Sequence, residues 1–400
     1  MLCLATGTVV QVTEKRPGWQ LLDIAMAETG RQEKAMSFAD EEYLPGEVLI
    51  VNTTAVRLQL GTGGYHLVVG KADQMSGCDL APGKWGHVMK MRYSPWQLAV
   101  DCVEEQESPY HELFVRDDLS LEGTPVLIGE LHSLLPVAVI ALKENDPAAK
   151  VVYVMPDGAS LPIALSRHVH RLKQKGLLTA TVTTGHAWGG DREAVTIHSG
   201  LLAARHVERA DVIVCMLGPG VAGTGTPYAF SGIQLAEVIH AVSALGGFPL
   251  LIPRISFADP RQRHLGISHH TLALLTRYVL WPVVLSLPLL GDERDGLLGK
   301  QMALLAKGET GKKHLIVKGR VPNIDRIARM EREYGMSFTT MGRSWQTDAV
   351  PFQTAVLAAD HLSAWRAELA RAFSADPHGF SSPDTFARLA LFSTKYEGQP

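Results

Sequence analysis

The chain has 400 residues, of which 46% are apolar and 20% charged, and 38 Lys and Arg balance 41 Asp and Glu to a formal net charge of -3. This composition excludes a disordered chain, and the absence of Lys and Arg clusters among aromatic residues argues against a nucleic-acid partner. The length and apolar content predict a globular protein of two domains.

Cysteine usage and the apolar runs indicate a cytoplasmic protein. The four cysteines lie in unrelated contexts without a C-x-x-C pair, which is typical of a reducing compartment. The start of the chain has no basic segment before a long apolar run, so we expect no signal peptide. The apolar stretch 272–290 is interrupted by Arg277, Pro282 and Pro288. It is typical of a helix followed by a buried strand, and we expect no membrane association.

The first part of the chain alternates short β-rich runs with turn sequences rich in glycine and proline. Five such runs within about 70 residues predict a small barrel of the OB or SH3 kind. A further hairpin and an acidic, turn-rich linker complete a first domain that we place at residues 1–118. The predicted strands cover 7–13, 19–26, 35–38, 47–60 and 65–69, and the hairpin covers 86–93 and 97–103.

From about Gly123 onward, apolar runs alternate with stretches of helical period. Continuous Val/Ile/Leu strands between amphipathic helices predict a doubly wound, Rossmann-like α/β domain with a mostly parallel sheet, at residues 119–373. Residues 374–400 form an expected appendage. The predicted strands are 125–128, 150–155, 178–183, 211–217, 249–253, 282–287 and 314–318, with a weaker one at 337–341. The predicted helices are 133–143, 161–175, 199–209, 231–245, 268–280, 294–307, 324–334 and 352–373.

Polar residues follow the predicted strands, at the edge where sheets of this class bind ligands. Turn chemistry explains the Gly, Asp and Ser of any single loop, but it needs neither imidazole nor indole. Since histidine titrates near neutral pH, His132 with Glu130 and His186 with Asp191 are candidate acid–base pairs. The further residues that we expect to contact a ligand from these loops are Asp157, Trp188, Arg192 and Arg254.

The loop after the fourth strand of this domain is rich in glycine. It formally matches the dinucleotide fingerprint G-x-G-x-x-G, but it follows the fourth strand instead of the first, and Arg254 stands where a ribose-binding acid is expected. We therefore predict an anion-binding loop, with free backbone N–H groups and threonine hydroxyls as donors. The sequence does not identify a cofactor. The loop residues assigned to binding are Gly218, Gly220, Gly223, Thr224, Gly225 and Thr226.

A metal site is an alternative use of the same loops. Glu130, His132, Asp157, His186 and Asp191 offer ligands for a divalent ion. No pair has a diagnostic spacing such as H-E-x-x-H, so we predict no metal. The adjacent pair at 269–270 is interpreted as two surface histidines at the start of a helix.

Three of these segments resemble one bacterial family. Residues 129–133, 184–196 and 218–227 are similar to a family of Gram-positive lineages known only as domain of unknown function 3866. The resemblance covers most of the chain, including the barrel-like start, and implies a bacterial cytoplasmic protein. It supplies neither an activity nor catalytic residues.

Two functional hypotheses follow from the residues. The first is an enzyme of transferase or hydrolase type that binds a phosphorylated or anionic small molecule, such as a nucleotide, at the carboxyl edge of the sheet. The second is a non-catalytic metabolite-sensing or scaffolding protein whose N-terminal barrel binds a partner. Apolar helices at 272–280 and 352–369 offer faces for a homo-oligomer.

Overall fold

The computed structural model describes residues 2–39, 41–59, 63–73, 86–307 and 314–376. The chain divides into two compact units, Met1–Gly83 and Lys84–Pro400. Residues 84–118, which the sequence pattern groups with the barrel, fall in the second unit. Most of the expected C-terminal appendage lies outside the described residues.

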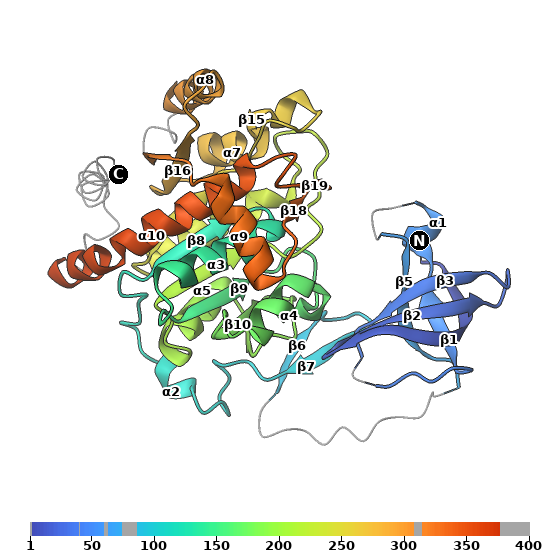
Figure 1. Ribbon diagram of the computed structural model, residues 1–400. Coiled ribbons are helices and arrows are strands. Elements are labelled where there is room, and N and C mark those ends of the chain that lie inside the picture. The colour runs from blue at the N-terminus through green and yellow to red at the C-terminus, as the bar shows by residue number, and fades with distance from the viewer. Residues whose placement is uncertain (1, 40, 60–62, 74–85, 308–313, 377–400) are drawn as a thin grey trace. The chain divides into compact units, whose positions relative to one another are not determined.

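The first unit contains the small closed barrel that the alternating pattern predicts (Figure 1). Its strand order is β1-β2-β3-β5-β4, in which β1 pairs with both β2 and β4 and so closes the barrel. Leu22, Ile24, Leu49 and Val51 fill its core. The predicted run 47–60 is a strand followed by the single helical turn α1 (Thr54–Arg57). The strands are β1 (Leu4–Arg16), β2 (Trp19–Met26), β3 (Gln32–Ser37), β4 (Val48–Asn52) and β5 (Tyr65–Lys71).

The second unit is built on an eight-stranded, all-parallel sheet, which confirms the predicted α/β class. Its order is β11-β10-β9-β12-β8-β13-β16-β17. Strands β8, β9, β10, β12 and β13 are buried at every position, because helices cover both faces. The strands are β8 (Pro125–Gly129), β9 (Val151–Met155), β10 (Ala180–Thr184), β11 (Arg192–Ala194), β12 (Val212–Met216), β13 (Phe248–Ile252), β16 (Val284–Leu289) and β17 (Leu315–Arg320).

Helices cover the two faces of this sheet in separate groups. One apolar core contains residues of α3, α4, α9 and α10, and the other contains residues of α5, α6 and α8 together with the continuation of α7. Figure 1 shows α9 and α10 on the same side of the sheet as α3. The helices are α3 (Leu135–Asn145), α4 (Arg167–Gln174), α5 (Ile197–Leu202), α6 (Leu235–Ala244), α7 (His269–Ala273), α8 (Arg294–Lys307), α9 (Ile324–Tyr334) and α10 (Val350–Ala375). Helices α5 and α7 continue as π-helical turns over Ala203–Val207 and Leu274–Tyr278.

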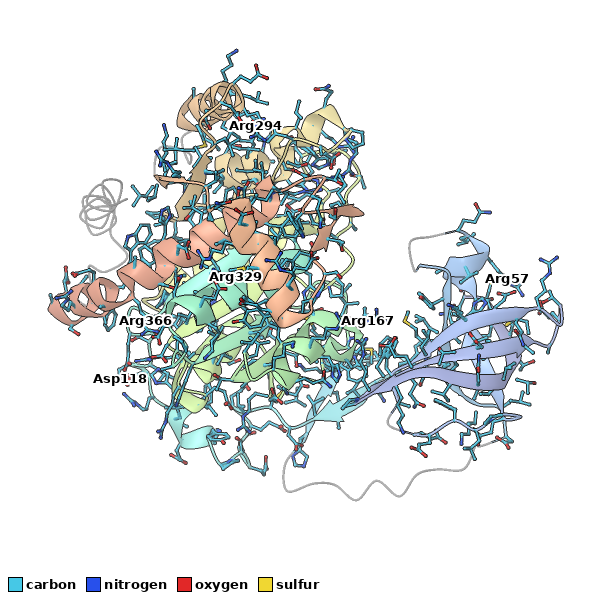
Figure 2. All side chains as sticks on the ribbon, viewed as in Figure 1. Arg57, Asp118, Arg167, Arg294, Arg329 and Arg366 are labelled. Atoms are coloured by element: carbon cyan, nitrogen blue, oxygen red, sulfur yellow. The ribbon has the colours of Figure 1, made fainter. Side chains whose placement is uncertain are left out.

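Ion pairs link the outer helices to the end of α3. Arg329 of α9 contacts Glu144 at 3.2 Å, and Arg366 of α10 contacts Asp146 at 2.5 Å. Figure 2 shows both arginines on the outside of the unit. Among the residues that the structure describes, no helix combines the length and the apolar character needed to cross a bilayer.

A hairpin and the segment after it cover one edge of the sheet. The predicted hairpin is present as β6 (Val88–Lys90) and β7 (Leu98–Val100), and the turn α2 (His111–Phe114) follows. The Lys90 side chain is 1% exposed, and its ammonium donates to Glu193 of β11 and to the carbonyl of Ala187, both at 2.6 Å. Cys102 pairs in parallel with Glu193, and the N–H of Val103 donates to the Glu193 carbonyl at 3.0 Å. The outer strand β11 therefore has a neighbour on its free side.

Besides the hairpin β6–β7, four short strands of the second unit lie outside the main sheet. The weak strand predicted at 337–341 is a two-residue strand, β18 (Thr339–Thr340), which pairs only with β19 (Arg343–Ser344). Between β13 and α7 the chain forms a small antiparallel pair, β14 (Ile255–Ser256) and β15 (Gly266–Ile267). The alternating pattern did not predict β14, β15 or β11, because each is too short to produce a periodic signal.

Candidate functional site

The strand order reverses in the middle of the sheet. Along the order β9-β12-β8-β13, the helix that follows each strand packs alternately on one face and the other. The loops at the carboxyl ends of these four strands therefore diverge, and such switch points are where open α/β sheets bind ligands. Glu130 follows β8, Asp157 follows β9, the glycine loop follows β12 and Arg254 follows β13.

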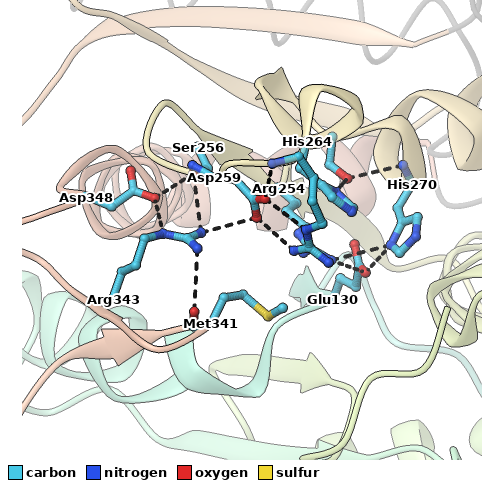
Figure 3. A network of polar contacts seen from close by, with 11 residues as sticks. Glu130, Arg254, Ser256, Asp259, His264, His270, Met341, Arg343 and Asp348 are labelled. Carbon is cyan, nitrogen blue, oxygen red and sulfur yellow. Dashed lines mark hydrogen bonds and ion pairs between the residues drawn. The ribbon is translucent and has the colours of Figure 1, made fainter. Parts of the chain in front are cut away.

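A buried ion pair joins two of the predicted site residues. Arg254 Nη1 donates to Glu130 Oε1 at 2.9 Å, and the two side chains are 7% and 6% exposed (Figure 3). His270 Nδ1 lies 2.7 Å from the same carboxylate oxygen. Burial alone would raise the pKa of Glu130, but the hydrogen bond to His270 and the charge of Arg254 outweigh it and lower this pKa. Glu130 is therefore a carboxylate, and it fixes the orientation of the His270 ring.

Three histidines gather beside this ion pair. His264 ends the turn Gln262–His264, and His269 and His270 begin α7. One ring nitrogen of each lies within 4.8 Å of the other two. His264 Nδ1 lies 2.8 Å from Ser268 Oγ, and the ring of His270 stacks on Phe230 with centroids 4.2 Å apart.

The interpretation of residues 269–270 as a surface pair is wrong. His270 is 5% exposed, and His269 Nε2 is buried without a hydrogen-bond partner among the described residues. The reason is the pair β14–β15, which brings the start of α7 under the loops of β8 and β12. Burial and the charge of Arg254 lower the pKa of His264 to about 3, and burial and His270 lower that of His269 to about 4.

Arginine 343 holds the segment that leads to His264. It contacts Asp259 at 3.3 Å and Asp348 at 3.2 Å (Figure 3). Asp259 also binds Arg261 at 2.8 Å. The hydrogen bond from Arg261 lowers the pKa of Asp259 well below its usual range. The charge network thus joins the loop after β13 to β19 and to the start of α10.

A glutamine of α8 holds the other side of the same segment. Gln301 accepts the N–H of Ile267 at 2.8 Å and donates to the carbonyl of Leu265 at 2.9 Å. Gly266 has a φ of +69°, and a Cβ there would lie 2.4 Å from the Gln301 amide oxygen. Glycine is therefore required at this position, and the backbone around His264 is fixed from both sides.

The glycine loop is a turn that bonds to itself. The N–H of Thr224 donates to the carbonyl of Ala229 at 2.9 Å, and the Thr224 and Thr226 hydroxyls lie 3.1 Å apart. Gly220 and Gly225 adopt positive φ angles of +95° and +78° and are exposed. The hydroxyls of Thr224 and Thr226 thus form hydrogen bonds within the loop, whereas the backbone at Gly220 and Gly225 is exposed to solvent.

This loop lies against the histidine cluster. A Cβ at Gly223 would be 3.3 Å from His270 Nε2, and a Cβ at Gly225 would be 3.9 Å from the guanidinium carbon of Arg263. Arg263 is exposed, and it has no acidic partner in the described ranges. Gly218 lies deeper, where a Cβ would be 2.8 Å from Leu161.

Asp157 and His186 meet at the neighbouring strand ends. Asp157 Oδ2 accepts the N–H of His186 at 2.8 Å, and its carbonyl accepts the side-chain amide of Gln234, which follows the glycine loop. His186 Nδ1 accepts the N–H of Met91 at 2.9 Å. The loops of β9, β10 and β12 are thus connected, with the His186 ring held by a backbone contact.

The structure places Asp191, Arg192 and Trp188 elsewhere. Asp191 accepts the N–H of Thr181 at 2.8 Å, and no hydrogen bond joins it to His186 in the described part of the chain. Arg192 pairs with Glu208 at 2.5 Å. Trp188 is bonded through its backbone to residues 161–163. Among the described residues, no hydrogen bond or ion pair joins these three residues to the glycine loop.

His132 turns away from Glu130. Its Nε2 lies 2.6 Å from Ser166 Oγ and its Nδ1 3.2 Å from the carbonyl of Leu217. Burial and the neighbouring His168 lower the pKa of His132 to about 3. The ring belongs to the α3 side of the sheet, so the structure does not bring the two residues together as an acid–base pair.

One comparison with known proteins identifies a family. Residues 34–359 match the sequence profile of a family described as protein of unknown function, DUF3866. The chain belongs to this family. No curated protein and no solved structure matches this chain. The resemblance noted in the sequence is therefore confirmed, and DUF3866 membership brings no activity with it.

Sequence reasoning missed the histidine cluster of this DUF3866 protein. The available signal was local, because His264, His269 and His270 fall within seven residues directly after a predicted strand and its loop. Arg263, beside the first of them, was also missed. The spacing H-x4-H-H matches no established motif, and only the β14–β15 pair brings the rings together.

Proposed function

We propose that this protein is an enzyme that binds a phosphorylated or otherwise anionic small molecule at the carboxyl edge of its sheet and catalyses a transfer or hydrolysis reaction. The observation that carries the proposal is the exposed glycine loop beside Arg263, an arginine without an acidic partner among the described residues. Backbone N–H groups at positive-φ glycines and a free guanidinium are the donors that phosphate groups prefer.

The contacts of the loop indicate which of its groups would bind the anion. The N–H groups near Gly220 and Gly225 are the best donors, because the Thr224 hydroxyl already donates to the Ala229 carbonyl. Arg254 is neutralised by Glu130. We therefore assign the counter-charge to Arg263, and we assign to Arg254 the positioning of Glu130.

The reactive group would be the imidazole that adjoins the loop. His270 lies next to Gly223, and its second nitrogen is held by Glu130. A carboxylate that fixes one nitrogen of a histidine leaves the other nitrogen in a defined orientation, as general acid–base catalysis requires. His186, beside Asp157, is the second imidazole at this edge.

The test is a binding screen with inorganic phosphate, nucleotides and sugar phosphates, followed by thermal unfolding. A compound present at 100 times its dissociation constant should stabilise the protein by about 2.7 kcal/mol. The stabilisation should disappear in Arg263→Ala and persist in the control Arg332→Ala, which removes an exposed arginine of α9. No response to any phosphorylated compound would contradict the proposal.

A second variant separates catalysis from sensing. His270→Gln should keep binding of the compound found in the screen and lose its turnover. If the wild-type protein binds the compound and turns nothing over, the metabolite-sensing alternative is favoured, and the barrel becomes the surface to test for a protein partner.

A further inference from the structure

We propose that His264, His269 and His270 form a binding site for a divalent transition-metal ion of the zinc class. One nitrogen of each ring lies within 4.8 Å of the other two. Neutral imidazole is a preferred ligand of zinc, copper, nickel and iron, and three histidines are a known ligand set for catalytic zinc. The metal site goes beyond the proposed function and can be tested without any substrate.

The first independent observation is an unsatisfied nitrogen. His269 Nε2 is buried and has no hydrogen-bond partner among the described residues. A buried polar atom left without a partner costs free energy, and in folded proteins it commonly marks the place of a water molecule or an ion. Here the atom belongs to a ring whose centroid lies 4.4 Å from that of His270 and 4.9 Å from that of His264.

The second observation is the set of partners behind the rings. Histidines that bind metals usually donate their other ring nitrogen to a carboxylate or another oxygen. His270 Nδ1 lies 2.7 Å from the Glu130 carboxylate, and His264 Nδ1 lies 2.8 Å from Ser268 Oγ. In both rings, Nε2 is therefore the nitrogen left for a ligand bond. Glu130 and Ser268 act as positioning residues for the two rings.

The dimensions of the cluster suit a small ion after modest ring rotations. Nitrogens bound at about 2.0–2.1 Å in a tetrahedral site lie about 3.3 Å apart. The ring nitrogens of the cluster, which are up to 4.8 Å apart, must therefore approach one another by up to about 1.5 Å to bind one ion. His269, which is only partly buried, has the most freedom to move. Three protein ligands leave a fourth position open, as in catalytic zinc sites.

The glycine loop borders the nitrogen of His270 that would bind the ion. A Cβ at Gly223 would lie 3.3 Å from His270 Nε2, so a larger residue there would compete with a ligand for this space. Only the catalytic consequence rests on the proposed function. With the ion bound, His270 Nε2 would be a metal ligand instead of the acid–base group, and a metal with an open position beside an anion-binding loop would specify metal-assisted hydrolysis or phosphoryl transfer.

The test measures metal content and affinity with Zn²⁺ or Co²⁺ alone. Metal-free wild-type protein should bind one Zn²⁺ per chain in competition with a chromogenic chelator, and bound Co²⁺ should give the visible absorption of a nitrogen-ligated ion. His264→Gln and His269→Gln should each lose this binding. Glu130→Gln should weaken it by about 10- to 100-fold, as for other partners of metal-bound histidines.

A matched control uses His87, a histidine that lies among possible ligand groups elsewhere in the described part of this unit. His87 and Glu107 are exposed and Glu105 is buried, and His87→Gln should keep the full stoichiometry. The proposal is overturned if wild-type protein binds neither ion, or if the His264 and His269 variants bind as tightly as wild type. If these variants fail to fold, the Co²⁺ spectrum of the wild-type protein decides. If the wild-type protein bound phosphate but neither metal ion, the metal site would be rejected and the proposed function would remain in place.

Discussion

The buried ion pair between Glu130 and Arg254 should be the most sensitive charge pair of the site. At 2.9 Å, Coulomb's law with an effective dielectric constant of about 20 gives an attraction of roughly 6 kcal/mol, which the cost of desolvating both groups offsets in part. Replacing only one partner leaves the other charge buried and uncompensated. We therefore expect Arg254→Met and Glu130→Gln each to lower the free energy of unfolding by about 3–5 kcal/mol.

The double variant Glu130→Gln/Arg254→Met distinguishes a coupled pair from two independent effects. It should lose clearly less stability than the sum of the single variants, because neither charge remains unpaired. The exposed pair Arg294–Asp292 is the control, and Asp292→Asn should leave the free energy of unfolding nearly unchanged, because an exposed ion pair contributes little.

Urea unfolding followed by helical circular dichroism is the appropriate assay, since the described helices of more than one turn lie in the second unit. A loss below about 1 kcal/mol in both single variants, or additive losses in the double variant, would refute the reasoning.

Two further predictions concern the core. Burial lowers the pKa of His361 to about 4 from an ordinary value of 6.5, so folding favours its neutral form. The contribution of the neutral His361 ring to the free energy of unfolding is complete above pH 6.5 and is lost as the pH falls from 6.5 toward 4. His361→Gln should therefore reduce the acid-side slope of unfolding free energy against pH by up to about 1.4 kcal/mol per pH unit, and an unchanged slope between pH 4 and pH 7 would contradict this. Gly200 of α5 packs on β10, where an added Cβ would lie 2.3 Å from Thr184 Cγ2. Gly200→Ala should cost about 1–3 kcal/mol in a urea titration, whereas Gly296→Ala, with open space on α8, should be neutral or stabilising; equal effects of the two changes would argue against close packing of α5.

The sequence pattern was sufficient for the main elements of the α/β unit and insufficient for the small ones. The helices at 294–307 and 324–334 have the predicted bounds. In the second of them, apolar and polar residues follow the helical period over several turns. Strand β11 was missed because Arg192, Glu193 and Ala194 carry no strand signal of their own. It forms where the buried Lys90 ammonium pairs with Glu193, a contact between positions about one hundred residues apart in the sequence.

The sequence predicted which loops gather at one edge of the sheet, but it did not predict where their side chains point. The rule that parallel strands end at a common edge predicted that the loops of Glu130 and Arg254 lie at one edge of the sheet, and an ion pair joins these two residues. It could not indicate that the His132 side chain points toward Ser166, or that Asp191 accepts hydrogen bonds from Thr181. Those directions depend on packing after the chain has folded. The histidines of α7 also depend on the β14–β15 pair, which is too short to be predicted.

The covered edge at β11 has a consequence for the solubility of fragments of this protein. An uncovered parallel strand offers a row of unpaired backbone groups to which another chain can add. Here the chain supplies its own cover, through Val103 and the buried ammonium of Lys90. A fragment that began at residue 119 would keep every strand of the main sheet and still expose this edge with the Glu193 charge unpaired. Such a fragment would therefore be prone to edge-to-edge association although no residue of the glycine loop had changed.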